Sequence, residues 1–528
     1  MSDVGVAASP VYPAGTPAPP RGAPRLDARA VIARPKWPET VLQFGEGNFL
    51  RAFVDWMLER MNAQGLFQGR AVLVQPIPSG MAALLNEQNG LYTVLLRGLV
   101  DGRAVDTREL VSSVSRCIDP HASWDAYIAC AANPRLRFVV SNTTEAGIRV
   151  EPDDALDARP ARSFPAKLTQ LLHARFLRFE GDRARGLVML PCELIERNGD
   201  ALRRAVGALA TRWRLGDAFL TWLDESCVFT NTLVDRIVTG YPTDGPDALA
   251  ASLGYDDRLA VAAEPFHAWV IEGPRALEDE LPLGKAGLAV TFTSDLRPYR
   301  DRKVRILNGA HTMTALAAFL AGHDTVRGFM DDDLIRGYMD RGISDEILPT
   351  LLLPPPESTT RALPRAELES FAAAVVERFR NPFIEHGLLS ISLNSLSKYR
   401  ARILPTVMDF IGMGDSPPPR LSFALAALCA FYRGREVEDG TLFGLRDGRR
   451  YPIRDDAAVL DFFLEAWAEV GDRPTALGCL KLVRRLLARA DFWDHDLDAR
   501  LPGFAEAVAQ HLNDIHVLGI RGALRQVA

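Results

Sequence analysis

The segment 39–76 constrains the fold most, because it has the pattern of a strand, a glycine turn, a helix and a second strand. The short apolar run VLQF is interrupted by GEG. Phe49, Phe53, Trp56, Met57 and Met61 then recur at the spacing of one helix face. The run RAVLVQP follows as a second buried strand that ends at a proline. Two strands joined through a helix form a parallel crossover, so the sequence predicts a parallel sheet.

The same alternation continues through the N-terminal half of the chain. The runs LRFVVSN, GLVMLPCEL and GLAVTFTSD predict further buried strands, and FPAKLTQLLHARFLRF predicts a helix between two of them. This pattern predicts an α/β fold with a doubly wound, Rossmann-like domain over residues 36–298. After Tyr299 the runs VRILNGAHTMTALAAFLAG, AELESFAAAVVERFRNP, RLSFALAALCAFYRG and AAVLDFFLEAWAEVG predict helices. We therefore expect a mostly α-helical domain over residues 299–528, after a disordered Pro/Ala-rich tail over residues 1–35.

Composition excludes several classes of protein. The chain has 528 residues, of which 48% are apolar and 24% are charged, and its net charge is −6. The charges are well mixed, so no nucleic-acid or membrane partner is indicated. The six cysteines form no CxxC pair, so we expect neither a disulfide framework nor a metal site, and a cytoplasmic location fits. The partner indicated is a small molecule, and the oligomeric state stays open.

The glycine turn predicts a dinucleotide site. Glycines two apart between a strand and a helix let a pyrophosphate approach free N–H groups at the helix start. Leu50 replaces the third glycine of the usual fingerprint, so a plain glycine turn is the alternative. Gln75 ends the second strand, where an acidic residue usually binds the ribose. No arginine stands there to bind a 2′-phosphate, so NAD is expected rather than NADP.

A second polar group is expected at the same sheet edge. Asn142, Thr143 and Thr144 follow a buried strand, at the end where ligands bind in such sheets, although a capped turn is an equal alternative. The residues expected to bind the cofactor are Phe44, Gly45, Gly47, Asn48, Phe49, Gln75, Asn142, Thr143 and Thr144.

The segment DRKVRILNGAH suggests acid–base chemistry. Alcohol oxidation needs a base for the hydroxyl proton and donors for the developing oxyanion. A lysine serves as base if burial and neighbouring positive charge lower its pKa, and Arg302 and Arg305 flank Lys303. On an α-helix Asn308 and His311 share a face, with Lys303 about 140° from Asn308. The alternative is a surface lysine beside two locally satisfied polar groups.

The chain resembles the long-chain mannitol dehydrogenase family. The motifs FGEGNFLRA, SNTTEAGI, LVDRIV and KVRILNGAH carry the resemblance, which runs from about Pro38 to the C-terminal region. PCELIERNGDALR, TLVDRIVTGYP and KYRARILP are similar to its uronate-reductase branch. The resemblance implies an NAD-dependent oxidoreductase of hexuronate catabolism that reversibly reduces D-tagaturonate to D-altronate. A fructuronate reductase, a polyol dehydrogenase and a non-catalytic dinucleotide-binding sensor are the alternatives.

The resemblance also implies residue roles. Lys303 is the expected base, Asn308 and His311 orient the substrate, and Lys398 lies on the substrate side. Polyol-type members carry Ser-Cys-Asp-Asn where this chain has Pro191, Cys192, Glu193 and Leu194, so Glu193 or Asn198 is expected to replace the missing oxyanion donor. The remaining residues expected to bind substrate are Asp235 and Arg236 of LVDRIV, and Arg402, which shares a face with Lys398 whether the segment is helical or extended.

Overall fold

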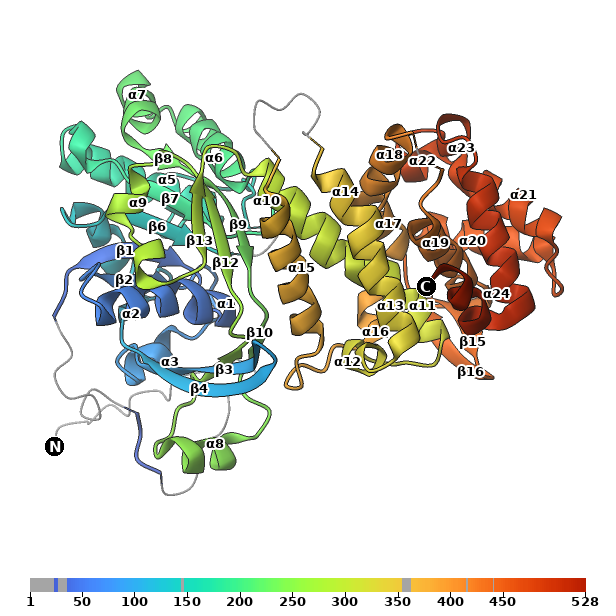
Figure 1. Cartoon of the computed structure of the whole chain (residues 1–528). Helices are drawn as coiled ribbons and strands as arrows, with labels where there is room; N and C mark the ends of the chain where they lie inside the picture. Colours follow the sequence, from blue (N-terminus) through green and yellow to red (C-terminus); the bar gives the residue numbers. More distant parts are fainter. Residues whose placement is uncertain (1–22, 27–35, 144–146, 354–361, 415, 440) are drawn as a thin grey trace. The chain divides into compact units, whose positions relative to one another are not determined.

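The computed structural model describes residues 23–26, 36–143, 147–353, 362–414, 416–439 and 441–528 (Figure 1). The chain divides into unit 1, which ends at Leu296, and unit 2, which runs from Arg297 to Ala528. Apart from residues 23–26, the predicted tail lies outside the described residues. Within the described ranges, no helix is both long and apolar enough to cross a membrane.

Unit 1 is built on a six-stranded parallel sheet. Its strands lie in the order β5-β2-β1-β6-β7-β8, and every neighbouring pair is parallel. Counted along the chain within this sheet, the order is 3-2-1-4-5-6, the arrangement of dinucleotide-binding folds. The strands are β1 (Glu39–Phe44), β2 (Arg70–Val74), β5 (Val114–Ile118), β6 (Phe138–Ser141), β7 (Val188–Pro191) and β8 (Val228–Phe229).

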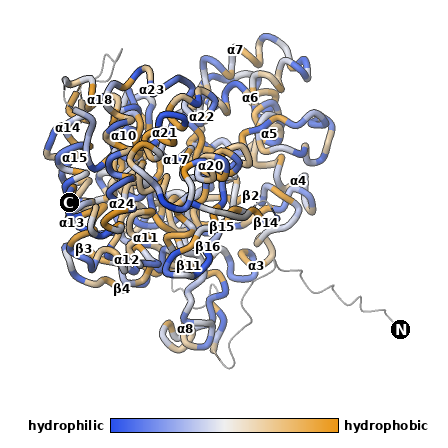
Figure 2. Tube along the Cα trace, turned by 90° about the vertical axis from the view of Figure 1, so that its right-hand side faces the viewer, coloured by the Kyte–Doolittle hydropathy of each residue, from blue (hydrophilic) through white to orange (hydrophobic). Residues whose placement is uncertain are grey.

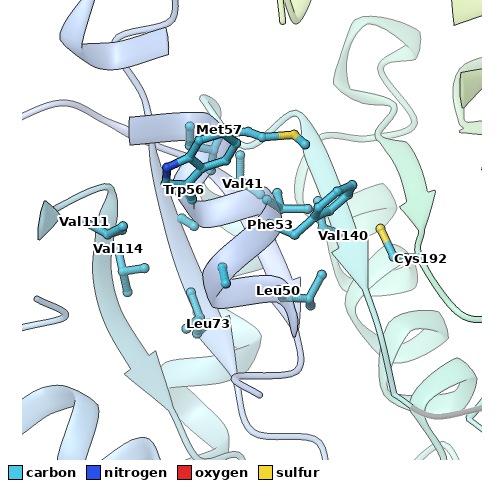
Figure 3. Close-up of a cluster of buried hydrophobic side chains, with 14 of the residues drawn as sticks. Val41, Leu50, Phe53, Trp56, Met57, Leu73, Val111, Val114, Val140 and Cys192 are labelled. Atoms are coloured by element: carbon cyan, nitrogen blue, oxygen red, sulfur yellow. The ribbon is translucent and has the colours of Figure 1, made fainter. Parts of the chain in front are cut away.

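Helices cover both faces of this sheet, because alternate strand residues are apolar on both sides. Figure 3 shows Leu50, Phe53, Trp56 and Met57 of the first helix packed against strand residues such as Val41. The opposite face, which includes Leu42 and Phe44, packs against other helices. The first helix is continuous through α1 (Asn48–Leu50), the π-helix η1 (Arg51–Asp55) and α2 (Trp56–Ala63); the opposite face carries α4 (Trp124–Ile128), η2 (Ala129–Ala132), α5 (Phe164–Arg178), α6 (Asn198–Arg212) and α7 (Asp217–Ser226).

Two smaller sheets also belong to unit 1, and the sequence analysis did not predict them. The run GLAVTFTSD was predicted to form a buried strand; it forms β13 (Val290–Thr293), which is only partly buried and lies in a separate three-stranded sheet. In that sheet β13 pairs in parallel with β12 (Ala268–Glu272). The sheets are β10 (Val238–Gly240), β11 (Val261–Ala263), β3 (Tyr92–Val100) and β4 (Arg103–Val111), and β13 (Val290–Thr293), β12 (Ala268–Glu272) and β9 (Asn231–Asp235); the other elements are α3 (Ala82–Glu87), η3 (Arg183–Arg185), α8 (Pro246–Leu253), α9 (Leu277–Glu280) and η4 (Gly284–Ala286).

Unit 2 is mostly α-helical, as predicted. Helix α19 is buried almost all round, which is expected of a helix rich in apolar residues on every face. Hydrophobic and hydrophilic residues alternate along α6 of unit 1, which contrasts with α19 because it is buried on one side only (Figure 2). The elements up to α19 are α10 (Arg297–Arg302), η5 (Lys303–Asn308), α11 (Gly309–Leu320), α12 (Val326–Met330), α13 (Asp333–Arg341), η6 (Gly342–Ile347), α14 (Leu348–Leu351), α15 (Arg365–Phe379), α16 (Leu388–Ile391), α17 (Ser395–Arg402), α18 (Leu404–Gly412) and α19 (Pro419–Phe431).

A small antiparallel sheet interrupts the helices of unit 2. Its strands pair in chain order, and the sequence analysis did not predict it. The long last helix is kinked at Gly519, whose φ of 71° lies outside the helical region. The elements are β14 (Gly434–Glu438), β15 (Thr441–Arg446), β16 (Arg449–Ile453), α20 (Ala457–Val470), α21 (Ala476–Leu487), α22 (Ala490–Trp493), α23 (Leu497–Arg500) and α24 (Phe504–Val527).

Candidate active site

The glycine turn lies at the carboxyl edge of the parallel sheet, between β1 and the first helix. Gly45 has a φ of 110°, and a Cβ atom there would lie 2.8 Å from the Asn142 carbonyl oxygen. The Gly45 N–H donates to the Val74 carbonyl at 3.0 Å, and the Asn142 N–H donates to the Phe44 carbonyl at 3.1 Å. The turn is therefore held against the ends of both neighbouring strands, and this close approach requires glycine.

The second glycine is different, because nothing in the structure requires it. Gly47 is the N-cap of the helix at a φ of −69°, and no atom lies within 4 Å of a Cβ placed there. No side chain caps the helix start. Buried Arg51 stabilises the turn, because it donates to the Glu46 carbonyl at 3.1 Å and to Asn48 Oδ1 at 2.7 Å. Open space in front of uncapped N–H groups fits the approach of a pyrophosphate.

Gln75 lies where it was expected, at the end of β2, but its side chain is engaged within the protein. Its amide nitrogen donates to the carbonyls of Ile77 and Pro78 at 3.0 and 3.2 Å. Its oxygen accepts from the Ala82 N–H at 3.2 Å. Gln75 therefore shapes the loop after β2. This loop borders a cavity of about 580 Å³ at the carboxyl ends of β2 and β5, lined by Gln75, Ser79, Gly80, Arg116 and Asp119 among others.

Asn142 and Thr143 lie beside the glycine turn and are bound to the end of the next strand. Glu193 accepts from the Ser141 hydroxyl at 3.0 Å and from the N–H and hydroxyl of Thr143 at 3.1 and 3.0 Å. Asn142 donates to the Cys192 carbonyl at 2.9 Å. Burial raises the pKa of Glu193. Thr144, expected at the same site, lies outside the described residues.

Five other predicted residues of unit 1 have positions that serve packing or local structure. The Phe44 ring is buried against Tyr127 and Phe164. Asn198 donates to three backbone carbonyls and accepts from two N–H groups, so its amide is fully used. Arg236 is buried, donates to the Ala52 and Glu264 carbonyls and lies 4.3 Å from the centre of the Trp56 ring. Asp235 is a buried residue at the end of β9, and Phe49 stacks on Phe53 at 4.9 Å.

In unit 2, Lys303 and Asn308 are the first and last residues of the π-helix η5. The expected angle of 140° between them assumed an α-helix, and the structure differs. A π-helix bonds residues five apart, so Lys303 and Asn308 are separated by about one turn. Short π-helical segments inside α-helices occur frequently at functional sites. His311 follows in the first turn of α11, three residues after Asn308.

The two arginines beside Lys303 are paired with carboxylates. Arg302 donates to Glu367 at 2.5 Å and lies 4.5 Å from the centre of the Phe371 ring. Arg305 donates to Asp409. Lys303 itself is partly buried at the start of η5. Arg302 and Arg305 were expected to supply positive charge near Lys303, and their ion pairs with Glu367 and Asp409 reduce that effect.

His311 lies in a cluster of basic side chains. Its ring stacks on Phe379 at 4.1 Å and meets the His386 ring edge-on at 5.3 Å. Its Nε2 atom is buried and has no hydrogen-bond partner among the described residues. Burial and then the charges of His386, Arg378, Arg402 and Lys398 hold the pKa of His311 well below its usual range. A neutral imidazole at this position can donate or accept a hydrogen bond.

Lys398 and Arg402 lie one turn apart on helix α17, which settles the two geometries considered for this segment. Lys398 donates to the Ile391 carbonyl at 2.8 Å, and Arg402 donates to the Thr312 hydroxyl at 3.2 Å. Burial, and then the charge of Arg402, lowers the pKa of Lys398. Arg400 points away and pairs with Asp494 at 3.2 Å.

Arg378, Phe379 and His386 also lie near His311, although no motif in the sequence indicated them. They lie in α15 and in the loop after it, more than 65 residues from His311, and no motif spacing links them. The local signal is weak, because the run NPFIEHGLL holds a single histidine. Among the described residues, no three histidine, cysteine or acidic side chains gather in a way that could hold a metal ion.

Comparison with known families covers both units. Residues 39–285 match the model of the mannitol dehydrogenase Rossmann domain, and residues 295–516 match that of the mannitol dehydrogenase C-terminal domain. Among solved structures, a substrate-free D-sorbitol dehydrogenase has a TM-score of 0.74 at 22% identity, covering 93% of this chain and 98% of that one. The ternary complex of Pseudomonas fluorescens mannitol 2-dehydrogenase with NAD and D-mannitol has a TM-score of 0.62 at 23% identity, covering 93% and 94%.

Curated relatives are closer in sequence. Altronate oxidoreductase of Escherichia coli O1:K1 is 46% identical over 491 residues, covering 93% of this chain and 97% of the relative. The protein of the same name from Escherichia coli K12 has the same identity and coverage.

Proposed function

The chain belongs to the mannitol dehydrogenase family, and we propose that it interconverts D-tagaturonate and D-altronate. It is an NAD-dependent dehydrogenase that acts on a CH–OH group. The finer assignment is supported by the relatives named altronate oxidoreductase, which match nearly the whole chain.

The carboxyl edge of the parallel sheet suits the dinucleotide. Gly45, Gly47 and the uncapped N–H groups of the first helix would bind the pyrophosphate. The cavity after β2 and β5 suits the adenosine. Asp119 lines this cavity, and its carboxylate would repel a 2′-phosphate. Arg116 also lines it, but Arg116 donates to both Glu39 oxygens, at 2.9 and 3.1 Å. These charges favour NAD over NADP.

Unit 2 supplies the proposed acid and base. When bound, NAD supplies the hydride acceptor for oxidation of the alcohol. Lys303 takes the hydroxyl proton as the alcohol carbon becomes a ketone, and in reduction its ammonium form returns that proton to the carbonyl oxygen. Asn308, about one turn along η5, and His311 hold the same oxygen and its neighbouring hydroxyl. Their neutral donors stabilise negative charge that develops on the oxygen.

The basic side chains around His311 are the observation that best supports an acidic substrate. Arg378, Lys398 and Arg402 act electrostatically on His311, together with His386, and each of these groups lowers its pKa. A concentration of positive charge around a candidate catalytic residue favours a substrate that carries a carboxylate.

The test is a comparison of substrates with the purified protein. Initial rates of NADH oxidation should be measured on D-tagaturonate, D-fructuronate and D-fructose, and repeated with NADPH. We expect the highest kcat/KM with D-tagaturonate and NADH. A higher value with fructuronate or fructose would reassign the substrate, and no turnover with any ketose would favour a non-catalytic sensor.

A further inference from the structure

The side chain of His386 is held in a way that leaves its polar atoms available. The backbone around it is fixed, because the His386 carbonyl accepts from the Val326 N–H at 3.0 Å and the Leu388 N–H donates to the Asp324 carbonyl at 2.8 Å. Within the described residues, no hydrogen bond engages either ring nitrogen of His386. The loop therefore presents an anchored imidazole whose donor and acceptor are unused.

The surroundings of this imidazole are positively charged. Its ring lies edge-on to His311 at 5.3 Å. Burial, and then the charge of Lys398, lowers the pKa of His386. Asp455 acts on Lys398 in the opposite direction, but its effect is smaller than those of burial and Arg402. The positive charges of Arg378, Lys398 and Arg402 disfavour a protonated imidazole at His311, and the same charges would attract an anion bound beside the two neutral rings.

We propose that His386 binds the carboxylate of the substrate together with Lys398, and so determines the preference for acidic over neutral substrates. The inference rests on the function proposed above, and it adds a residue that no motif of the sequence indicated. Lys398 supplies the charge, and the imidazole supplies a directed hydrogen bond from a different element of the fold. Such a pair selects a carboxylate over a hydroxymethyl group, because a neutral group leaves Lys398 uncompensated.

The experiment compares the His386→Ala, His386→Gln and wild-type proteins on D-tagaturonate and on D-fructose. The measured quantity is the quotient of the two kcat/KM values, acid over neutral. We expect His386→Ala to lower this quotient by about 10- to 150-fold, the range for loss of one hydrogen bond to a charged group. His386→Gln keeps a side-chain donor and should lie between Ala and wild type. His495, which is exposed in the same unit, provides the control His495→Ala, whose quotient should equal that of the wild type.

Binding measurements separate this inference from the proposed function. Calorimetric titration with D-altronate in the presence of NADH should give weaker binding for His386→Ala than for the wild type. If the wild type prefers fructuronate, the substrate assignment fails, while the quotient measured with fructuronate still tests His386. An unchanged quotient and unchanged altronate binding in folded His386→Ala and His386→Gln would overturn the inference.

Discussion

At the scale of single residues, Lys303 carries the chemistry that we propose. Lys303→Ala should lower turnover by about 10² or more, since general acid–base catalysis contributes roughly 10²–10⁴-fold. The variant should still bind NADH, because the residues that we propose to bind the dinucleotide belong to unit 1. Activity should return partly when a small primary amine such as methylamine is added, which would not happen if Lys303 only supported the fold.

The control for this prediction is Lys481→Ala, because Lys481 is exposed in the same unit. Its turnover should match the wild type. Turnover of Lys303→Ala near that of the wild type would remove Lys303 from the role of base.

Gly47 tests dinucleotide binding without disturbing the fold. Its φ of −69° suits alanine, and the space beside it is open. Gly47→Ala should therefore cost at most about 1 kcal/mol of stability, as a change of N-cap residue. Binding of NADH, measured by calorimetry, should weaken at least about tenfold, because the methyl group would occupy the space that the pyrophosphate needs.

Gly207→Ala is the matched control, since a Cβ there also meets nothing within 4 Å but lies on helix α6, away from the turn. Equal NADH affinity in the two variants would show that the open space at Gly47 has no part in binding.

At the scale of elements, the two sides of helix α17 are expected to differ in their effect on substrate preference. Lys398 and Arg402 lie one turn apart, while Arg400 pairs with Asp494. Lys398→Met and Arg402→Met should each lower the quotient of kcat/KM on tagaturonate over fructose by about 10- to 150-fold. Arg400→Met, on the same helix, should leave the quotient at its wild-type value. A similar loss in all three variants would mean that α17 supports the fold, and that the carboxylate is bound elsewhere.

The elements also show what the sequence could and could not predict. Buried parallel strands and long amphipathic helices were predicted because their apolar periodicity is a local property. The hairpins β3–β4 and β15–β16 were missed, although Asp101-Gly102 and Asp447-Gly448 connect them with positive φ at every turn residue. Asp-Gly between strands is a strong hairpin signal, so both hairpins were predictable from the sequence.

The candidate site was predictable only in part. Sequence motifs indicated Lys303, Asn308 and His311 as site residues. The π-helical geometry that places Lys303 and Asn308 one turn apart depends on packing around η5, which the motifs do not record. Gln75 was expected to face a ligand, and its hydrogen bonds to the following loop could not be read from its position at a strand end. The approach of His386 to His311 joins positions far apart along the chain, which no local pattern records.

At the scale of the whole molecule, a buried carboxyl group links the stability of unit 1 to pH. Asp55 is fully buried in η1, where it accepts from the Tyr92 hydroxyl at 3.0 Å and from Gln43 at 3.2 Å. Burial raises the pKa of Asp55 from 3.8 to about 7, against the opposing effects of these hydrogen bonds and of Arg51. The folded state therefore binds more protons than the unfolded state between these two pH values.

Stability that depends on protonated Asp55 is present at low pH and is lost as the pH rises toward about 7, with a limiting slope of about 1.4 kcal/mol per pH unit.

Asp55→Asn removes this proton but keeps an oxygen that can accept from Tyr92 and Gln43. The stability of the variant relative to the wild type should therefore increase from about pH 4 to about pH 7 and stay constant above it. Hydrogen exchange of the β1 and β2 amides, which reports on unit 1, would measure it. Asp157→Asn, at an exposed loop position of the same unit, is the control. A difference between Asp55→Asn and the wild type that does not change with pH would mean that Asp55 is charged in the folded protein throughout this range.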